Sequence, residues 1–315
     1  MNSNNTIIIG VDVAKDKLDS MLSPMGDHKV IANCAQSIKR WLLELKHSYD
    51  IELLVLEATG GYEQTCRKQC DRLGIPVHVA HPNQVHHFAL AHKLYAKSDK
   101  SDAKILARFG EQTHVQATPP ENPADKALQK AVRRKQQLTD DLIREKQRLN
   151  HPELDKDSIR SFKRAIKFFE KEIELTNAKL EKSIQSDEKK AAQVKRLCSY
   201  KGIGLSTAIT VTACIPELGQ LSRAGVANLV GLAPINKDSG KKQGYRSIRG
   251  GRFYVRKALY MAALSAIRFN PAMKSFYKKL RDKGKKAKVA ITAVMRKMII
   301  TLNAMIKNQT DWQPC

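Results

Sequence analysis

The chain has 315 residues, which is long enough for about two domains that each bury a hydrophobic core. Its formal net charge of +25 indicates a polyanionic partner, and nucleic acid is the first candidate because basic side chains gain affinity by displacing condensed counterions. The first residues lack the basic start of a signal peptide and no apolar run approaches the length of a membrane span, so we expect a cytoplasmic, nucleoid-associated protein without a membrane partner.

The first third of the chain alternates between apolar strands and helices, which predicts an α/β fold. Residues 6–12 form a buried strand that ends in Asp12, and residues 51–57 form a second strand that ends in Glu57. The other predicted elements are strands over residues 17–22, 29–31 and 76–79, a helix over residues 37–47 and a helix that carries Cys66 and Cys70.

Acidic side chains end the two buried strands and open a third element. Asp99 and Asp102 stand three residues apart, on one face of the first turn of a predicted helix. A carboxylate at the end of a buried strand is costly without a cation beside it, and four such groups can surround two divalent ions. Two simpler interpretations stay open: Asp12 begins a solvated turn, and Asp99 and Asp102 only cap their helix and complement its dipole.

The order and surroundings of these four acids resemble a known family. The order Asp, Glu, Asp-x-x-Asp is similar to the RuvC-like branch of the ribonuclease H fold. The neighbouring residues resemble the DEDD transposases of the insertion-sequence-110 type, relatives of the Piv invertase, in the runs Gly10-Val11-Asp12-Val13-Ala14-Lys15, Glu57-Ala58-Thr59-Gly60-Gly61-Tyr62-Glu63 and Lys97-Ser98-Asp99-Lys100-Ser101-Asp102-Ala103. The resemblance implies that Asp12, Glu57, Asp99 and Asp102 are catalytic and bind Mg²⁺ or Mn²⁺.

The middle of the chain predicts a helical coiled-coil arm. Apolar residues recur at heptad-like spacing over residues 124–149 and more regularly over residues 159–184, and Pro152 separates the two helices. The helices either fold back as an antiparallel pair or run on as staggered helices. We expect the arm to join protomers, and a hairpin within one chain is the alternative.

The last part of the chain is predicted to be mainly helical and is strongly basic. Gly202-Ile203-Gly204 stands between two helical stretches, where it either presents backbone N–H groups to a phosphate or forms an ordinary turn. The basic run that follows exceeds what a solvated face needs, and it predicts contacts with nucleic acid. The cations that we assign to these contacts are Lys241, Lys242, Arg246, Arg249, Arg252 and Arg256.

The family resemblance extends to this last part, in which the family uses a serine in a Ser-Gly step to attack DNA. That serine falls on Ser239, which from the residues alone is a loop serine. The resemblance further implies a transposase or site-specific recombinase that acts on double-stranded DNA, is guided by a structured RNA from its own element, and forms dimers or tetramers. The alternatives are a RuvC-like junction nuclease, which would leave Ser239 idle, and a basic nucleic-acid-binding protein without activity.

These predictions divide the chain into three parts. They are an α/β domain of RuvC-like ribonuclease H fold over residues 1–118, the coiled-coil arm over residues 119–190 and a mainly helical transposase domain over residues 191–315. The six cysteines show no paired spacing, so we expect neither a structural zinc site nor a disulfide framework.

Overall fold

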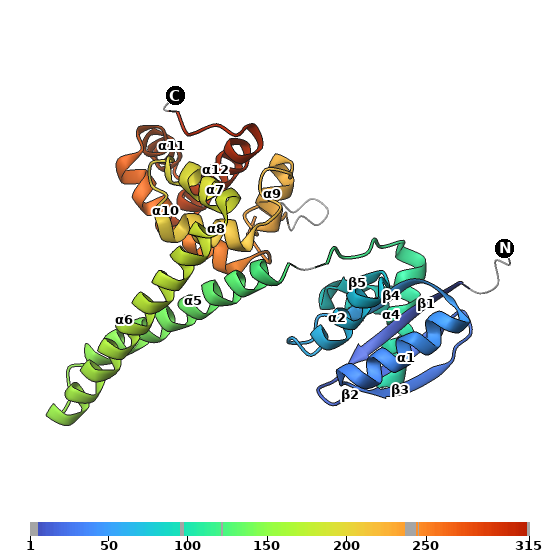
Figure 1. Ribbon diagram of the computed structural model, residues 1–315. Coiled ribbons are helices and arrows are strands. Elements are labelled where there is room, and N and C mark those ends of the chain that lie inside the picture. The colour runs from blue at the N-terminus through green and yellow to red at the C-terminus, as the bar shows by residue number, and fades with distance from the viewer. Residues whose placement is uncertain (1–5, 95–97, 121, 237–243, 245, 314–315) are drawn as a thin grey trace. The chain divides into compact units, whose positions relative to one another are not determined.

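The computed structural model describes residues 6–94, 98–120, 122–236, 244 and 246–313. The chain divides into two compact units, residues 1–121 and residues 122–315. Within the described residues, all five strands belong to the first unit, whereas the second consists of helices and one isolated strand bridge (Figure 1). The predicted combination of an α/β part with a mainly helical part is therefore confirmed.

The first unit is built on a five-stranded sheet of mixed direction. Its strands are β1 (Thr6–Val13), β2 (Lys17–Ser23), β3 (His28–Ala32), β4 (Asp50–Glu57) and β5 (Val77–Ala80). Their order is β3-β2-β1-β4-β5, in which β1 pairs antiparallel with β2 and parallel with β4. A three-stranded meander followed by parallel strands fits the RuvC-like arrangement that the sequence suggests.

Helices cover both faces of this sheet. They are α1 (Ala35–Ser48), α2 (Gln64–Leu73), α3 (Pro82–Ala91) and α4 (Asp99–Thr113). Ile7 and Ile9 of β1 join the core formed with α1 and α2, whereas Ile8 joins the core formed with α3 and α4. Because β1 is buried on both faces, nearly all of its positions are apolar. The helix α3 was not predicted from the sequence, because it has few apolar residues on one face.

A close approach between β1 and α4 sets the position of that helix. A Cβ atom at Gly10 would lie 2.1 Å from the carbonyl oxygen of Ala103 and 2.3 Å from the backbone nitrogen of Ala107. Only glycine therefore lets the helix lie this near the strand, and the small side chains of Ala103 and Ala107 are buried in the contact. The first turn of α4 is thereby held next to the central strand.

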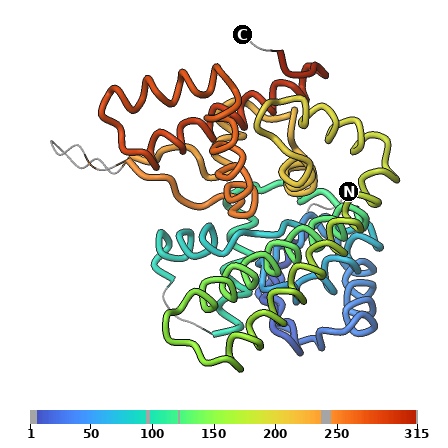
Figure 2. Tube along the Cα trace, turned by 90° about the vertical axis from the view of Figure 1, so that its left-hand side faces the viewer, coloured from blue at the N-terminus to red at the C-terminus, as the bar shows by residue number. Residues whose placement is uncertain are grey.

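The second unit is helical in its described part. Its helices are α5 (Pro123–Leu149), α6 (Lys156–Gln185), α7 (Glu188–Cys198), α8 (Leu205–Cys214), α9 (Arg223–Leu229), α10 (Phe253–Phe269), α11 (Pro271–Asp282) and α12 (Ala287–Asn308). α5 and α6 fold back on each other as a long hairpin that projects from the other helices of the unit (Figure 1, Figure 2). One of the two arrangements expected for the arm is thus observed, while its coiled-coil packing and its role in joining protomers stay predictions.

The helix α12 corrects one expectation from the sequence. By length and composition it is apolar enough to cross a membrane, although the sequence analysis found no such segment. Its residues Val294, Met298 and Leu302 are fully buried in the core of the helical unit, against α10 and other helices. We therefore interpret α12 as a core helix, whose apolar composition reflects burial on several sides.

Candidate active site

Two of the predicted acids meet at one edge of the sheet. Asp12 is the seventh residue of the strand β1, and Glu57 is the last residue of β4. The two strands are parallel neighbours, and the register that pairs Val11 with Leu56 brings the following residues, Asp12 and Glu57, side by side. Both carboxylates are partly buried because they emerge from strands that are covered on both faces.

The other two predicted acids lie in the first turn of α4. The helix is capped by Ser98, whose hydroxyl accepts a hydrogen bond from the backbone N–H of Ser101 at 3.2 Å, and the Ser101 hydroxyl returns a contact to the backbone of Ser98. Because Ser98 and Ser101 cap the helix, the carboxylates of Asp99 and Asp102 are not its N-cap. Their negative charge still complements the helix dipole, so this interpretation and a ligand role coexist.

The charge of Asp102 affects the pKa of both strand-end acids. Burial raises the pKa of Asp12 to about 6, and the negative charge of Asp102 contributes to this rise. Burial and the same Asp102 charge also raise the pKa of Glu57, and the nearby His81 offsets part of that effect. Asp102 is therefore the carboxylate that acts on both strand-end acids.

Asp99 is held differently, by a lysine that the sequence analysis did not select. The ammonium group of Lys17 lies 2.6 Å from an Asp99 carboxylate oxygen and 3.0 Å from one of Asp19. The hydrogen bond from Lys17 lowers the pKa of Asp99. Asp19 is buried, stands opposite Asp12 in the β1–β2 register, and also contacts His28 Nε2 at 2.9 Å. The sequence alone does not give the register between β1 and β2, and without that register Lys17 and Asp19 could not be assigned to the site.

The turn after Glu57 is organised by the last residue of its motif. Glu63 is buried, and its carboxylate accepts hydrogen bonds from the backbone N–H groups of Thr59 at 3.1 Å and Gly61 at 2.9 Å. Burial alone would raise the pKa of Glu63, but these hydrogen bonds and one from Gln64 lower it. Glu63 therefore stays ionised and shapes the loop that follows Glu57.

The acids fit a hard divalent cation by their chemistry and charge. Carboxylates stand at the ends of β1 and β4 and in the first turn of α4, and a cation would offset the burial and the repulsion from Asp102 that raise the pKa of Asp12 and Glu57. In the part of the chain that the structure describes, no three Asp, Glu, His or Cys side chains lie close enough to hold one metal ion together. Lys17 holds Asp99 by an ion pair, so Asp99 would have to exchange this partner for a metal.

The raised pKa of Asp12 predicts how its replacement affects stability. The folded protein binds the Asp12 proton more tightly than the unfolded chain does, so ionised Asp12 destabilises the fold above about pH 6 and ceases to do so below about pH 4. In buffer with EDTA, Asp12→Asn should raise the free energy of unfolding by about 1–3 kcal/mol near pH 8 and by little near pH 4. Urea denaturation of both proteins at the two pH values measures this, and a difference independent of pH would contradict it.

The predicted nucleophile Ser239 lies outside the described residues, and so do two of the predicted cations, Lys241 and Lys242. The chain on either side of this segment is described. Ile235 and Ser247 form an isolated antiparallel bridge, with backbone hydrogen bonds of 2.9 and 3.3 Å. The two ends of the stretch that contains Ser239 therefore lie next to each other on the helical unit.

The turn Gly202-Ile203-Gly204, which was predicted to contact a phosphate, lies directly before α8. Gly204 is the N-cap of α8, no side chain caps that helix, and its first residues are exposed. Gly202 has a φ angle of 109°, and a Cβ atom there would lie 2.6 Å from the Cβ of Ala266 on α10. Gly202 is thus required by packing, whereas Gly204 leaves backbone N–H groups of α8 accessible to an anion.

Two of the arginines assigned to nucleic acid have structural partners instead. The Arg252 guanidinium forms two hydrogen bonds of 2.6 Å with the Glu217 carboxylate and one of 2.8 Å with the carbonyl oxygen of Cys214. Arg256 donates to the carbonyl oxygens of Val230 and Gly250. These bonds hold the loop before α10 in place, so a phosphate contact at Arg252 or Arg256, which stays a prediction, would compete with partners within the protein. Arg246 and Arg249 are exposed and remain candidates.

This distinction predicts different effects for neighbouring arginines. Arg252→Ala should lower the free energy of unfolding by about 1–2 kcal/mol, because a bidentate, partly buried ion pair with Glu217 is lost. Arg249→Ala should leave stability unchanged but flatten the salt dependence of DNA affinity by about one unit. Denaturation curves and binding titrations at several salt concentrations measure both quantities. A loss of stability in Arg249→Ala equal to that in Arg252→Ala would contradict this assignment.

Comparison with known proteins covers most of the chain. Residues 9–152 match a DEDD transposase domain of the IS110 type, and residues 194–278 match the transposase IS116/IS110/IS902 family. The pilin gene-inverting protein of Moraxella lacunata is 26% identical over 318 residues, which cover 95% of each chain. An uncharacterized 43.6 kDa protein of the insertion element IS110 from Streptomyces coelicolor is 29% identical over 37% of this chain and 29% of its own length.

Among solved structures, RuvC of T. thermophilus in complex with a Holliday junction substrate is similar to part of the chain. The match has 15% sequence identity and a TM-score of 0.28, and it covers 36% of this chain and 98% of the RuvC chain.

Proposed function

Because this chain belongs to the IS110 family of DEDD transposases and recombinases, we propose that it cuts and rejoins double-stranded DNA through a serine–DNA intermediate at a metal-dependent site. The observation that supports the proposal is the position of Asp12 and Glu57 on neighbouring parallel strands, together with the effect of the Asp102 charge on the pKa of both. The family matches cover both the acid cluster and the part of the chain that contains Ser239.

In this proposal the four acids hold divalent metal. Asp12, Glu57 and Asp102 supply oxygens from the converging elements, and Asp99 joins them when it leaves Lys17. Bound divalent metal would neutralise charge on the reacting phosphate and favour ionisation of an attacking hydroxyl. Lys17 remains beside Asp19 after such a change and keeps that buried carboxylate paired.

The proposed covalent step uses the Ser239 hydroxyl. Its oxygen forms a bond to a DNA phosphorus, one deoxyribose oxygen leaves that phosphorus, and the hydroxyl proton passes to a general base. The phosphoserine diester conserves the energy of the broken bond, so a second deoxyribose hydroxyl can attack it and rejoin strands without an external energy source. A hydrolase would lose this energy when water attacks.

The acids and Ser239 belong to different compact units. We propose that the working site combines the acid cluster of one protomer with the serine of another, in a dimer or tetramer. We further propose that a structured RNA guides the choice of DNA, which the net charge of +25 supports because an RNA backbone can be held mainly by cations.

A test for a covalent adduct separates this proposal from its rivals. The purified chain is incubated with Mg²⁺, the RNA transcribed beside its gene and DNA that carries the ends of its own element, and the products are run on denaturing gels. We expect protein-linked DNA that disappears with EDTA. Cleaved DNA without attached protein would identify a RuvC-like nuclease, and the absence of any cleavage under these conditions would favour a binding protein.

A further inference from the structure

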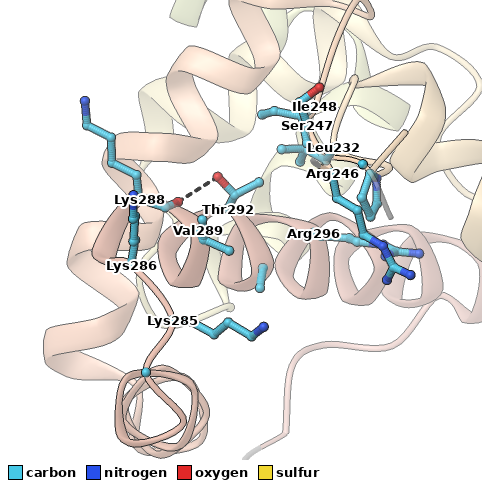
Figure 3. A pocket seen from close by; sticks show the side chains of 14 residues that line it. Leu232, Arg246, Ser247, Ile248, Lys285, Lys286, Lys288, Val289, Thr292 and Arg296 are labelled. Carbon is cyan, nitrogen blue, oxygen red and sulfur yellow. Dashed lines mark hydrogen bonds between the residues drawn. The ribbon is translucent and has the colours of Figure 1, made fainter. Parts of the chain in front are cut away.

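A basic pocket lies on the helical unit, between the bridge at Ser247 and the start of α12. It has a volume of about 850 Å³, which is within the range of ligand pockets. Five cations line it, with Arg246 and Arg296 on one side in Figure 3 and the three lysines on the other. They are Arg246, Lys285, Lys286, Lys288 and Arg296. Of these five cations, only Arg246 was predicted from the sequence to contact nucleic acid.

The charges of this basic pocket have no acidic partners within the described part of the chain. None of the five cations forms an ion pair with a residue that the structure describes. The Nε atom of Arg296 is buried and has no hydrogen-bond partner among the described residues. Lys286 is the N-cap of α12, and no side chain caps that helix. Like charges gathered without counterions are costly, so the pocket is suited to an anion.

A second hollow, lined by aromatic side chains, adjoins the basic pocket. It lies between α5, α8 and α10 and has a volume of about 690 Å³. Phe253, Tyr254 and Tyr260 contribute rings to its lining, and the Phe253 side chain is 56% exposed. Lys135 also lines this hollow, and its ammonium donates a 2.7 Å hydrogen bond to the Ser206 hydroxyl, in the first turn of α8, which no side chain caps.

The two hollows meet, because Ile248 and Thr292 line both. The joined surface therefore combines cations that have no ion pair among the described residues with exposed aromatic rings and with Lys135 beside the start of α8. We propose that this surface binds a single strand of unpaired DNA, with phosphates in the basic pocket and at least one base stacked on the ring of Phe253. Alternation of cations and rings is the pattern of single-strand binding sites, where the cations follow the backbone and the rings stack on bases.

The position of the surface favours DNA as the occupant. Leu232, Pro234 and Arg246, which line the basic pocket, flank the segment that contains Ser239. The inference rests on the proposed function, since the strand beside Ser239 would be the strand that is cut. A double helix presents no base face to Phe253, so the aromatic hollow would serve no purpose in binding intact duplex.

Binding measurements without metal test this inference apart from catalysis. Fluorescence anisotropy in EDTA gives the affinity of the full chain for a labelled single-stranded DNA, for the same sequence as duplex, and for the same sequence as RNA, at several salt concentrations. The triple variant Lys285→Gln, Lys286→Gln, Lys288→Gln should bind single-stranded DNA at least about tenfold more weakly. Its salt slope should fall by about two, since each lost phosphate contact on a single strand removes about 0.7.

A charge-matched control shows whether the effect belongs to the basic pocket. The variant Lys163→Gln, Arg164→Gln, Lys167→Gln removes three exposed cations from α6 and therefore lowers the net charge by the same amount. We expect it to bind single-stranded DNA nearly as well as the wild type. Equal losses in the two triple variants would overturn the inference, because binding would then follow total charge.

Phe253 tests the stacking contact. Phe253→Ala should weaken binding of single-stranded DNA by about fivefold or more and leave its salt slope and the duplex affinity unchanged. A 2-aminopurine base in the strand should be quenched by the wild type and less by this variant. An equal loss for duplex in Phe253→Ala, or a larger loss for RNA than for single-stranded DNA, would overturn the inference. If the wild type forms the covalent adduct while all these variants bind normally, only the inference fails; if it binds no nucleic acid, the proposed function fails too.

Discussion

Asp102→Asn is expected to abolish DNA strand exchange while the protein remains folded. Asp102 is the acid of α4 whose charge raises the pKa of both Asp12 and Glu57, in addition to the effect of burial. Asparagine keeps the shape of the side chain, and the Ser98–Ser101 capping box still holds the first turn of α4. The variant lacks one anionic oxygen donor, so metal binding and compensation of phosphate charge weaken together. We expect the rate to fall at least about a thousandfold.

A matched acid elsewhere in the same unit makes this result specific. Asp27 is exposed in the turn between β2 and β3, and Asp27→Asn changes the net charge by the same amount. Strand exchange, measured on DNA that carries the element ends, should be normal in this control. Circular dichroism should show that both variants are folded. Normal exchange by Asp102→Asn would remove Asp102 from the site and leave the acids with only a structural role.

The strand-end acids could be predicted because their positions follow from simple rules. Long apolar runs that end in an acid mark central strands, and the carboxyl ends of adjacent parallel strands meet at the same edge. The helix α4 could be predicted from its first turn. Its distance from β1 could not, because it depends on the contact between Gly10 and the backbone at Ala103.

Contacts between distant segments could not be predicted from the sequence. Lys17 reaches Asp99 across 82 residues, and Arg252 reaches Glu217 across 35. A run of basic residues predicts an affinity for anions but does not show which guanidinium groups are already used within the protein. The same limit explains why Lys285 and Lys286 were not grouped with Arg246, since only the packing of α12 beside the Ile235–Ser247 bridge brings them together.

The hairpin of α5 and α6 shows a third kind of limit. The heptad spacing predicted two long helices, and both are present. Much of the apolar stripe on α6 is only partly buried, and Phe168 beside it is 57% exposed. A heptad pattern does not show whether the helix that packs against it belongs to the same chain or to another protomer. An exposed apolar stripe on a projecting hairpin is consistent with the predicted contact between protomers.

Ser239→Ala is expected to abolish the covalent protein–DNA adduct completely. If Ser239 supplies the oxygen that bonds to phosphorus, alanine has no atom to replace it, and no phosphodiester to the protein can form. The acids lie in the other compact unit, and loss of an uncharged hydroxyl leaves the net charge of the protein unchanged. The variant should therefore bind divalent metal, RNA and DNA as the wild type does.

Mixing two inactive proteins tests whether the site is shared between protomers. Ser239→Ala retains the acid cluster and Asp12→Ala retains the serine, so mixed oligomers contain one intact composite site when the two parts come from different chains. Some strand exchange should return in the mixture, and the adduct on denaturing gels should carry only the Asp12→Ala chain, identified by a size tag. No activity in a verified mixed oligomer would place both parts in one chain. An adduct that persists in Ser239→Ala alone would show that another residue is the nucleophile.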